Sequence, residues 1–275
     1  MQHIDAHCHF WKLDRGDYGW LDGEGGPLDA IRRDFLPAQY PSDMDRIVVQ
    51  AAPSEAETDF LLTLAKETPQ IRGVVGWVDL TDPEAEQTLD RWSGDKHLLG
   101  LRPMLQDIED TDWLLQQARP ALVDRLIAQG LRFDALVTER HLPMFETFVD
   151  RHPDLKVVID HAAKPQPGWG EGWASGMKAL AGHEHIHCKL SGLLTELDPG
   201  ERENPLAALQ AIFHPLLDWF GPERLIWGSD WPVLTMAAPW QRWRDLTEEL
   251  LSDLSSDERG AILSGNARRF YGLTS

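Results

Sequence analysis

The sequence predicts a single-domain α/β protein, in which eight parallel strands and their helices form a (β/α)8 barrel over residues 1–275. Eight short apolar runs rich in β-branched residues recur along the chain, and segments with helical periodicity separate them. The length also lies within the usual span of one barrel, so it requires no second domain. Regular alternation of eight strands with helices favours a barrel over a doubly wound sheet.

The expected strands are short, and two of them, around Ile47–Val49 and Val157–Ile159, are apolar at every position. Such runs are typical of parallel strands that are buried on both faces. In chain order the expected strands are His3–Phe10, Arg46–Ala51, Gly73–Leu80, Leu98–Met104, Arg132–Val137, Lys156–Ala162, His187–Leu193 and Leu225–Ser229.

Helix signals fall between these runs. The pattern Ser54-x-x-Glu57 is a capping box, and it precedes a one-sided apolar stripe that begins at Phe60. A second stripe runs through Leu206–Phe220, and Ser255-x-x-Glu258 marks the start of the last helix. The segment Asp14–Pro41 is long for a βα loop. Because barrel enzymes bind substrates through such loops, we expect it to reach the mouth of the barrel.

The charge composition of the chain excludes some classes of binding partner. The chain has 26 Lys+Arg and 45 Asp+Glu, a formal net charge of −19, and no basic cluster offsets it locally. This balance repels nucleic-acid phosphates and anionic lipid, so we expect neither as a partner. No apolar run is long enough for a membrane span, the first residues show no targeting pattern, and two cysteines make no disulfide framework. We therefore expect a cytoplasmic protein.

The first strand contains His7-x-His9 near its end. Side chains two residues apart on a strand share a face, so Asp5, His7 and His9 are expected to point one way and Cys8 the other. Two imidazoles on one face suit a divalent metal or a group of donors around an oxyanion. For the pair alone, two histidines that only satisfy local hydrogen bonds are the better interpretation, so further residues must support a site.

Two further strands end in polar residues of the same kind. His161 follows the apolar run at strand six, and Asp230 follows strand eight. In a barrel, strand eight closes against strand one, so Asp230 is expected beside His7 and His9, with His161 converging from strand six. A helix cap before Pro232 is the alternative for Asp230 alone.

Other polar and aromatic residues also fall at strand ends. Arg102, Lys164 and Lys189 can hold a substrate oxygen, and structural ion pairs are an equally good interpretation of Arg102 and Lys189. Aromatic rings stack well on sugar faces. The expected substrate-binding residues are Trp11, Trp77, Lys164, Lys189 and Trp231.

The sequence resembles the amidohydrolase superfamily, in the branch of lactonases and decarboxylases related to 2-pyrone-4,6-dicarboxylate lactonase. Within it, the chain is most similar to sugar-acid lactonases of the L-fuconolactonase and L-rhamnonolactonase type. Segments that carry the resemblance run from the first strand to the last helix: Ile4–His9, Tyr18–Leu21, Gly76–Asp79, Gly100–Arg102, Asp160–Pro165, Cys188–Gly192, Gly228–Pro232 and Asn266–Phe270.

The resemblance implies a distorted TIM barrel whose site lies at the carboxyl ends of the strands. It implies that His7, His9, His161 and Asp230 form the catalytic cluster, and Arg102 stands where some relatives carry a metal-bridging lysine. Strand five offers no histidine, so two metals are not expected. The cluster is compatible with one Zn²⁺ or Mn²⁺ and equally with metal-free catalysis.

The expected reaction is hydrolysis of a sugar-derived lactone, of the fucono, rhamnono or galactono type, to its aldonic acid. Asp230 would act as general base on water, with the histidines and Arg102 around the carbonyl oxygen. The alternatives are a metal-dependent decarboxylase of an aromatic or unsaturated acid, a pyrone-dicarboxylate lactonase and a non-catalytic sugar-acid-binding barrel. Neither the particular sugar nor the oligomeric state follows from the sequence.

Overall fold

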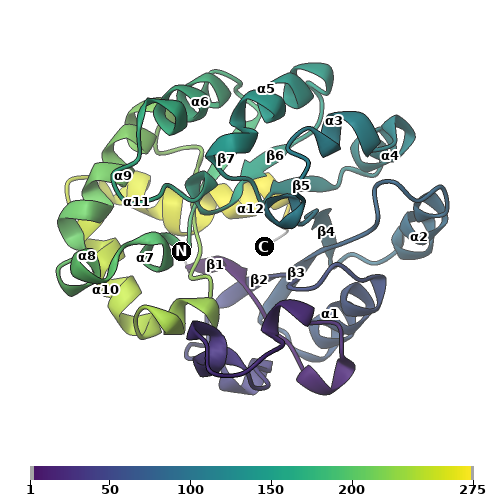
Figure 1. Ribbon diagram of the computed structural model, residues 1–275, viewed down its shortest axis with the longest axis horizontal. Coiled ribbons are helices and arrows are strands. Elements are labelled where there is room, and N and C mark those ends of the chain that lie inside the picture. Colours follow the sequence, from purple (N-terminus) through teal and green to yellow (C-terminus); the bar gives the residue numbers. More distant parts are fainter. Residues whose placement is uncertain (1–2, 274–275) are drawn as a thin grey trace.

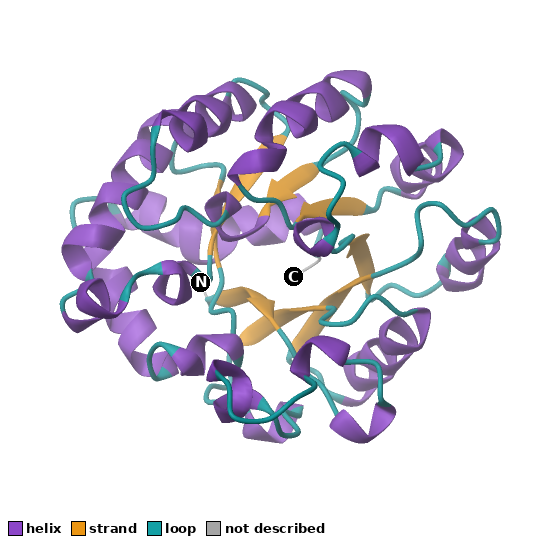
Figure 2. Cartoon of the chain, in the orientation of Figure 1, coloured by secondary structure: helices purple, strands orange, loops and turns teal. Residues whose placement is uncertain are grey.

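The computed structural model of the protein describes residues 3–273. All eight strands belong to one parallel sheet, in the order β1 to β8, and the sheet curves into a ring that helices surround (Figures 1 and 2). This confirms the predicted (β/α)8 barrel. The strands are β1 Ile4–Cys8, β2 Asp45–Val49, β3 Ile71–Gly76, β4 Leu98–Leu101, β5 Arg132–Ala135, β6 Val157–Ile159, β7 Ile186–Leu190 and β8 Leu225–Trp227.

The helices follow the strands and form the outer layer of the barrel (Figure 2). They are α1 Glu55–Glu67, α2 Ala85–Trp92, α3 Trp113–Gln117, α4 Pro120–Gln129, α5 Leu142–Arg151, α6 Glu171–Ala181, α7 Leu193–Glu196, α8 Pro199–Glu203, α9 Leu206–Phe220, α10 Trp240–Leu250, α11 Ser256–Gly260 and α12 Asn266–Tyr271. The side chains of Ser54 and Ser255 cap α1 and α11, as the two capping boxes predict.

Each predicted strand overlaps an observed one, but all eight predicted strands extend too far at their carboxyl ends. Strand β1 ends at Cys8 rather than Phe10, and β6 ends at Ile159 rather than Ala162. The reason is that the apolar residues after each strand pack in the buried loops at the mouth of the barrel, where the backbone has already left the sheet. Periodicity does not distinguish such residues from a strand.

Strand β1 carries a bulge. Pairing with β2 runs from Asp5 opposite Arg46 to Cys8 opposite Val48, so β1 has one extra residue in this interval. The Asp5 carboxylate accepts hydrogen bonds from Tyr40 and Ser229 and does not join His7 and His9. The prediction that Asp5 points with the two histidines was wrong, because a bulge shifts the alternation of side chains by one.

The barrel closes between β1 and the residues that follow β8. The backbone N–H of Asp230 donates to His7 O at 2.7 Å, and that of His9 donates to Trp231 O at 2.7 Å. These two bonds continue the ladder beyond Trp227, the last residue of β8. The closure therefore places Asp230 directly beside the two histidines of the first strand.

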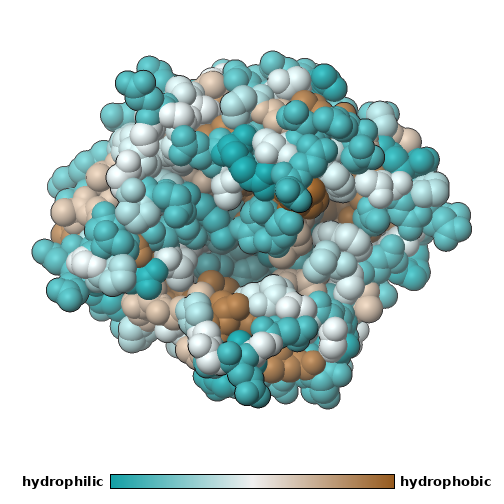
Figure 3. Space-filling model, viewed as in Figure 1, coloured by the Kyte–Doolittle hydropathy of each residue, from teal (hydrophilic) through white to brown (hydrophobic). Residues whose placement is uncertain are grey.

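The inside of the barrel is apolar at its floor and polar at its mouth. A small apolar cluster joins inward residues of the strands, including Val75, Val158 and Ile226, to Ala267 and Phe270 of α12. Helix α12 lies behind the ring of strands in Figure 1. The opposite face is hollowed near its middle (Figure 3), and the site described below lies at that end.

Between residues 3 and 273, no helix has the length and apolar character that crossing a membrane requires.

Candidate active site

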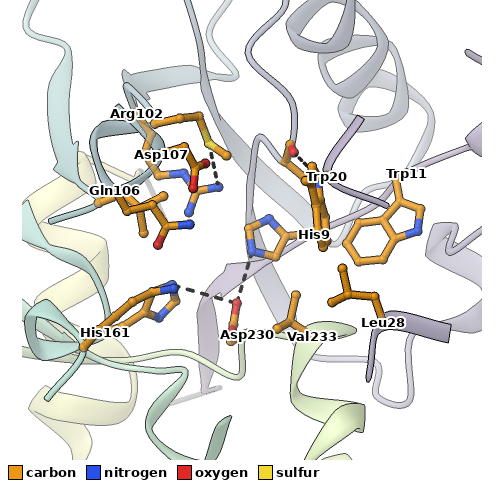
Figure 4. Close-up of a pocket in the computed structure, with 14 residues that line it drawn as sticks. His9, Trp11, Trp20, Leu28, Arg102, Gln106, Asp107, His161, Asp230 and Val233 are labelled. Carbon is orange, nitrogen blue, oxygen red and sulfur yellow. Dashed lines mark hydrogen bonds and ion pairs between the residues drawn. The ribbon is translucent and has the colours of Figure 1, made fainter. Parts of the chain in front are cut away.

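Three histidines and one aspartate converge at the carboxyl ends of β1, β6 and β8 (Figure 4). The Asp230 Oδ1 atom lies 3.1 Å from His9 Nε2, 3.8 Å from His7 Nε2 and 4.0 Å from His161 Nε2. All four side chains are nearly or completely buried. The structure thus brings together the four residues predicted as the catalytic cluster.

An unusual backbone turn places His161. Residues 161–164 all have positive φ, between 49° and 57°, although none of them is glycine. A left-handed residue with a side chain is unfavourable by roughly 1–2 kcal/mol, so the surrounding contacts must hold the turn. The His161 ring packs against Gly192, where an added Cβ would lie 2.6 Å from His161 Nδ1. The turn directs both His161 and Lys164 into the same cavity.

A hydrogen bond fixes which ring nitrogen of His9 carries a proton. Its Nδ1 atom lies 2.8 Å from Val49 O, and because a carbonyl only accepts, Nδ1 carries the proton. In the neutral ring Nε2 then presents a lone pair to the Asp230 carboxylate, 3.1 Å away. Two acceptors at this distance repel each other unless a positive charge lies between them, either a second proton on His9 or a cation.

A buried ionic network lies beneath His7. Its Nδ1 atom is 3.1 Å from Lys189 Nζ and 3.3 Å from Asp160 Oδ1, so it faces one donor and one acceptor. Lys189 Nζ also contacts Asp160 at 3.0 Å and Asp134 at 2.5 Å. Burial strongly lowers the pKa of His7, which therefore remains neutral near pH 7. Lys189 can only donate to Nδ1 and Asp160 can only accept from it, so the two contacts favour opposite tautomers of the neutral ring. The tautomer with its proton on Nδ1 turns the Nε2 lone pair to the cluster.

The electrostatics of the cluster favour an ionised Asp230. Burial is the largest influence and raises the pKa of this carboxyl, but His161, His9 and His7 together outweigh it, and the pKa lies well below its usual range. Burial lowers the pKa of His161 to about 4. At neutral pH the site therefore combines a carboxylate with neutral imidazole at His161.

The donor set fits one divalent cation. His7, His9 and Asp230 each offer one ligand atom, and these atoms lie within 4.8 Å of one another. His7 Nε2 is buried and has no hydrogen-bonding partner among residues 3–273. Two imidazole nitrogens and a carboxylate are typical ligands of Zn²⁺, and the carboxylate behind His7 resembles the outer carboxylates that orient ligating histidines. His161 lies outside this group of three.

A cavity of about 270 Å³ opens above the cluster, and three of the other predicted site residues line it, namely Trp11, Arg102 and Lys164. Arg102 donates to Gln50 O and lies 3.7 Å from Asp160 Oδ2, so one guanidinium both lines the cavity and approaches the buried network.

Three predicted substrate-binding residues do not line this cavity. Lys189 is completely buried beneath His7, which agrees with the alternative of a structural ion pair. Trp231 packs among the rings of Phe10, Phe35 and Tyr40, because the bonds that close the barrel turn it into the outer layer. Trp77 lines a neighbouring hollow, with Met104 and Asp107 shared between the two.

The sequence prediction omitted several residues that line the cavity. Trp20 and Leu28 come from the long loop after β1, which was expected to reach the mouth, although neither residue was assigned there. Gln106 and Asp107 follow β4 in a short 3₁₀ helix. The only local sign of the last two was their position shortly after Arg102.

Glu57 of α1 holds the loop that follows β2. Its carboxylate accepts the backbone N–H groups of Ala51 and Ala52, and Ala51 O in turn accepts the indole N–H of Trp20 at 2.7 Å. Burial raises the pKa of Glu57 to about 7, although the two backbone amides oppose this effect.

The raised pKa gives a stability prediction. Between the unfolded value of 4.5 and about 7 the native carboxyl binds more protons than the unfolded one, so its contribution to stability decreases as pH rises. The variant Glu57→Gln has no titrating group at this position. Relative to this variant, the free energy of unfolding of the wild type should fall by on the order of 1 kcal/mol per pH unit across this window. Urea unfolding of both proteins at pH 5 and pH 7.5 measures the difference, and an unchanged difference would contradict it.

Comparison with known proteins agrees with this geometry. The family model described as amidohydrolase matches residues 4–273. An L-fucono-1,5-lactonase from Burkholderia ambifaria is 40% identical over 98% of this chain and 94% of that protein. An L-fucono-1,5-lactonase from Burkholderia multivorans is 38% identical over 98% and 96%. A crystal structure of a Burkholderia multivorans amidohydrolase with bound zinc has a TM-score of 0.91, with 38% identity and complete coverage of both chains. The chain belongs to the amidohydrolase family.

Proposed function

We propose that the protein hydrolyses a sugar-derived lactone to its aldonic acid, with L-fucono-1,5-lactone as the first substrate to test. The observation that carries this proposal is the buried Asp230 carboxylate, surrounded by three imidazoles at the base of a cavity of about 270 Å³. The two relatives named for this lactone, 40% and 38% identical over nearly the whole chain, support the choice of substrate.

Asp230 would act as the general base. As an ionised carboxylate it accepts a proton from a water molecule, whose oxygen then attacks the lactone carbonyl carbon. The ester bond to the ring oxygen breaks, and Asp230 returns its proton to that oxygen, which becomes the hydroxyl of the aldonic acid. Because water itself attacks the carbonyl carbon, the reaction requires no covalent bond between enzyme and substrate.

Arg102 and the imidazoles supply electrostatic stabilisation. Arg102 lines the cavity and its position is fixed by Gln50 O, so its charge is available to an oxyanion without rearrangement. His7, His9 and Asp230 would hold one divalent cation, which would polarise an oxygen bound at the cluster. His161 Nδ1 lies 2.9 Å from Ser191 Oγ, which fixes the orientation of that ring.

The charges of the cavity favour a neutral lactone over a dicarboxylate. Its two cations are already partly compensated, since Arg102 lies 3.7 Å from Asp160 and Lys164 lies 3.8 Å from Glu196. Asp107 adds a negative charge to the lining. A pyrone diacid would bring two further negative charges into this environment.

The test is a pH-indicator assay on fresh L-fucono-1,5-lactone, because lactone hydrolysis releases a proton. The expected result is a higher kcat/KM for this lactone than for a pyrone diacid or for aromatic carboxylic acids. Carbon dioxide release from an aromatic acid without lactone hydrolysis would instead support the decarboxylase.

Metal binding is tested independently of activity. Zn²⁺ added to chelator-treated protein should raise the melting temperature, because a ligand that binds the native state stabilises it. A ligand at 100 times its Kd raises the free energy of unfolding by about 2.7 kcal/mol. A variant with both His7→Asn and His9→Asn should lose the shift, whereas His183→Asn should retain it, because His183 lies before the start of β7 and is not part of the cluster. Equal shifts in all three proteins would contradict a site at the cluster.

A further inference from the structure

The cavity above Asp230 has two chemically different sides (Figure 4). Arg102, Gln106 and Asp107 lie on one side of the catalytic cluster, and this set is called the polar wall, although Met104 beside Arg102 also lines the cavity. Trp11, Trp20, Leu28 and Val233 lie on the other, and this set is called the apolar wall. Segments distant in the sequence form the apolar wall together, because the 3₁₀ helices Pro27–Ile31 and Val233–Met236 pack against each other.

The apolar wall has no free hydrogen-bonding group. The indole N–H of Trp11 donates to Arg33 O at 2.8 Å, and that of Trp20 donates to Ala51 O at 2.7 Å. Both tryptophans therefore present only ring carbons to the cavity, and Leu28 and Val233 have no polar side-chain atoms. A hydroxyl group placed against this wall loses its water partners and gains none.

The polar wall has free groups. Within residues 3–273 only the backbone atoms of Gln106 and Asp107 form hydrogen bonds, so the half-buried amide of Gln106 and the exposed carboxylate of Asp107 have no protein partner. An amide offers both a donor and an acceptor, and a carboxylate accepts from hydroxyl groups. This wall can therefore satisfy adjacent hydroxyls on a sugar ring.

A 1,5-lactone of a 6-deoxy sugar has the same division. With its carbonyl carbon at the cluster, one edge of the ring carries the hydroxyls on C2 and C3, and the opposite edge carries the methyl group on C5. We infer that the two walls orient the ring, with the C5 methyl group against Trp20, Leu28 and Val233 and the C2 and C3 hydroxyls at Gln106 and Asp107. This inference rests on the proposed lactonase function and adds the orientation and the specificity-determining residues.

The inference predicts a preference for methyl over hydroxymethyl at C5. L-Fucono-1,5-lactone and L-galactono-1,5-lactone differ only in this group, so the ratio of their kcat/KM values reports on the residues that surround the C5 substituent. An apolar pocket discriminates against an added hydroxyl by roughly 10- to 100-fold, and a ratio in that range is the expected result.

Two nearly isosteric variants separate the walls. Val233→Thr replaces a methyl group by a hydroxyl on the apolar wall and should reduce the ratio about tenfold, mainly by improving kcat/KM for the galactono compound. Gln106→Met removes the amide from the polar wall and should lower kcat/KM for both lactones by a similar factor, leaving the ratio within twofold. Leu28→Asn is a second variant of the apolar wall and should also reduce the ratio. Melting temperatures of the three variants verify that each is folded.

The outcomes distinguish the orientation from the reaction. A wild-type ratio near one, or a ratio that responds to Gln106→Met and not to Val233→Thr and Leu28→Asn, would overturn the orientation while leaving lactone hydrolysis in place. Absence of hydrolysis of both compounds by the folded wild type would overturn the proposed function, and the inference with it.

Discussion

Asp230→Asn is expected to lower kcat for lactone hydrolysis by roughly 10²–10⁴, the range typical of a lost general base. An amide cannot accept the proton of the attacking water, so the loss should persist at every pH. The substrate contacts made by the two walls of the cavity remain, and KM should therefore change far less than kcat.

The backbone favours this substitution as a clean test. Asp230 has a φ of 60°, and asparagine tolerates left-handed backbone better than residues other than glycine. The variant should therefore fold, whereas alanine would add backbone strain. Asp253→Asn is a matched control, because Asp253 is exposed on the surface and should leave kcat unchanged. Turnover near the wild-type value in Asp230→Asn, with folding verified by circular dichroism, would exclude Asp230 as the base.

The sequence was sufficient to predict the barrel and the convergence of the four cluster residues. Eight apolar runs define the strands, and strand order in a barrel then places the end of β8 next to β1, which brings Asp230 to His7 and His9. This inference depends only on topology. It did not depend on the carboxyl ends of the strands, which the sequence placed too late in all eight.

Features that depend on local backbone geometry could not be predicted. The bulge in β1 turns Asp5 away, and no residue type in Ile4–Cys8 indicates it. The left-handed turn from His161 to Lys164 has no glycine, although glycine is the usual sign of positive φ. Lys189 illustrates a different difficulty, since the strand position predicts the direction of its side chain but not its depth below the mouth.

The depth of Lys189 leads to the second large effect. Its ammonium group is completely buried and lies between two buried carboxylates, Asp134 at 2.5 Å and Asp160 at 3.0 Å. Burial raises the pKa of Asp134 to about 6, even though Lys189 opposes this effect. The pKa of Asp160 lies well below its usual range, because Lys189, His7 and Arg102 together outweigh the effect of burial. The ammonium therefore balances charge that nothing else at this depth can fully neutralise.

Lys189→Met keeps the volume of the side chain but leaves both carboxylates without their main counter-charge. We expect a loss of roughly 3–5 kcal/mol in the free energy of unfolding at pH 7, the usual result of breaking a buried ion pair from one side. Lys178→Met removes an exposed ammonium from α6 and should change stability by no more than about 0.5 kcal/mol. Adding Asp134→Asn to Lys189→Met should recover part of the loss, because one of the uncompensated charges is then absent.

The pH dependence of this loss distinguishes uncompensated charge from lost packing. Without Lys189 the native pKa of Asp160 rises above its unfolded value, and the pKa of Asp134, already raised in the wild type, rises further. The variant therefore gains stability as these carboxyls are protonated at lower pH. In the wild type, Asp160 has a lowered pKa, and that contribution is lost only as pH falls through the native value. The stability difference between the two proteins should therefore shrink steadily from pH 7.5 to pH 5, measured by urea unfolding at each pH. A difference that stays constant would mean that the methylene chain of Lys189, rather than its charge, supports the floor beneath His7.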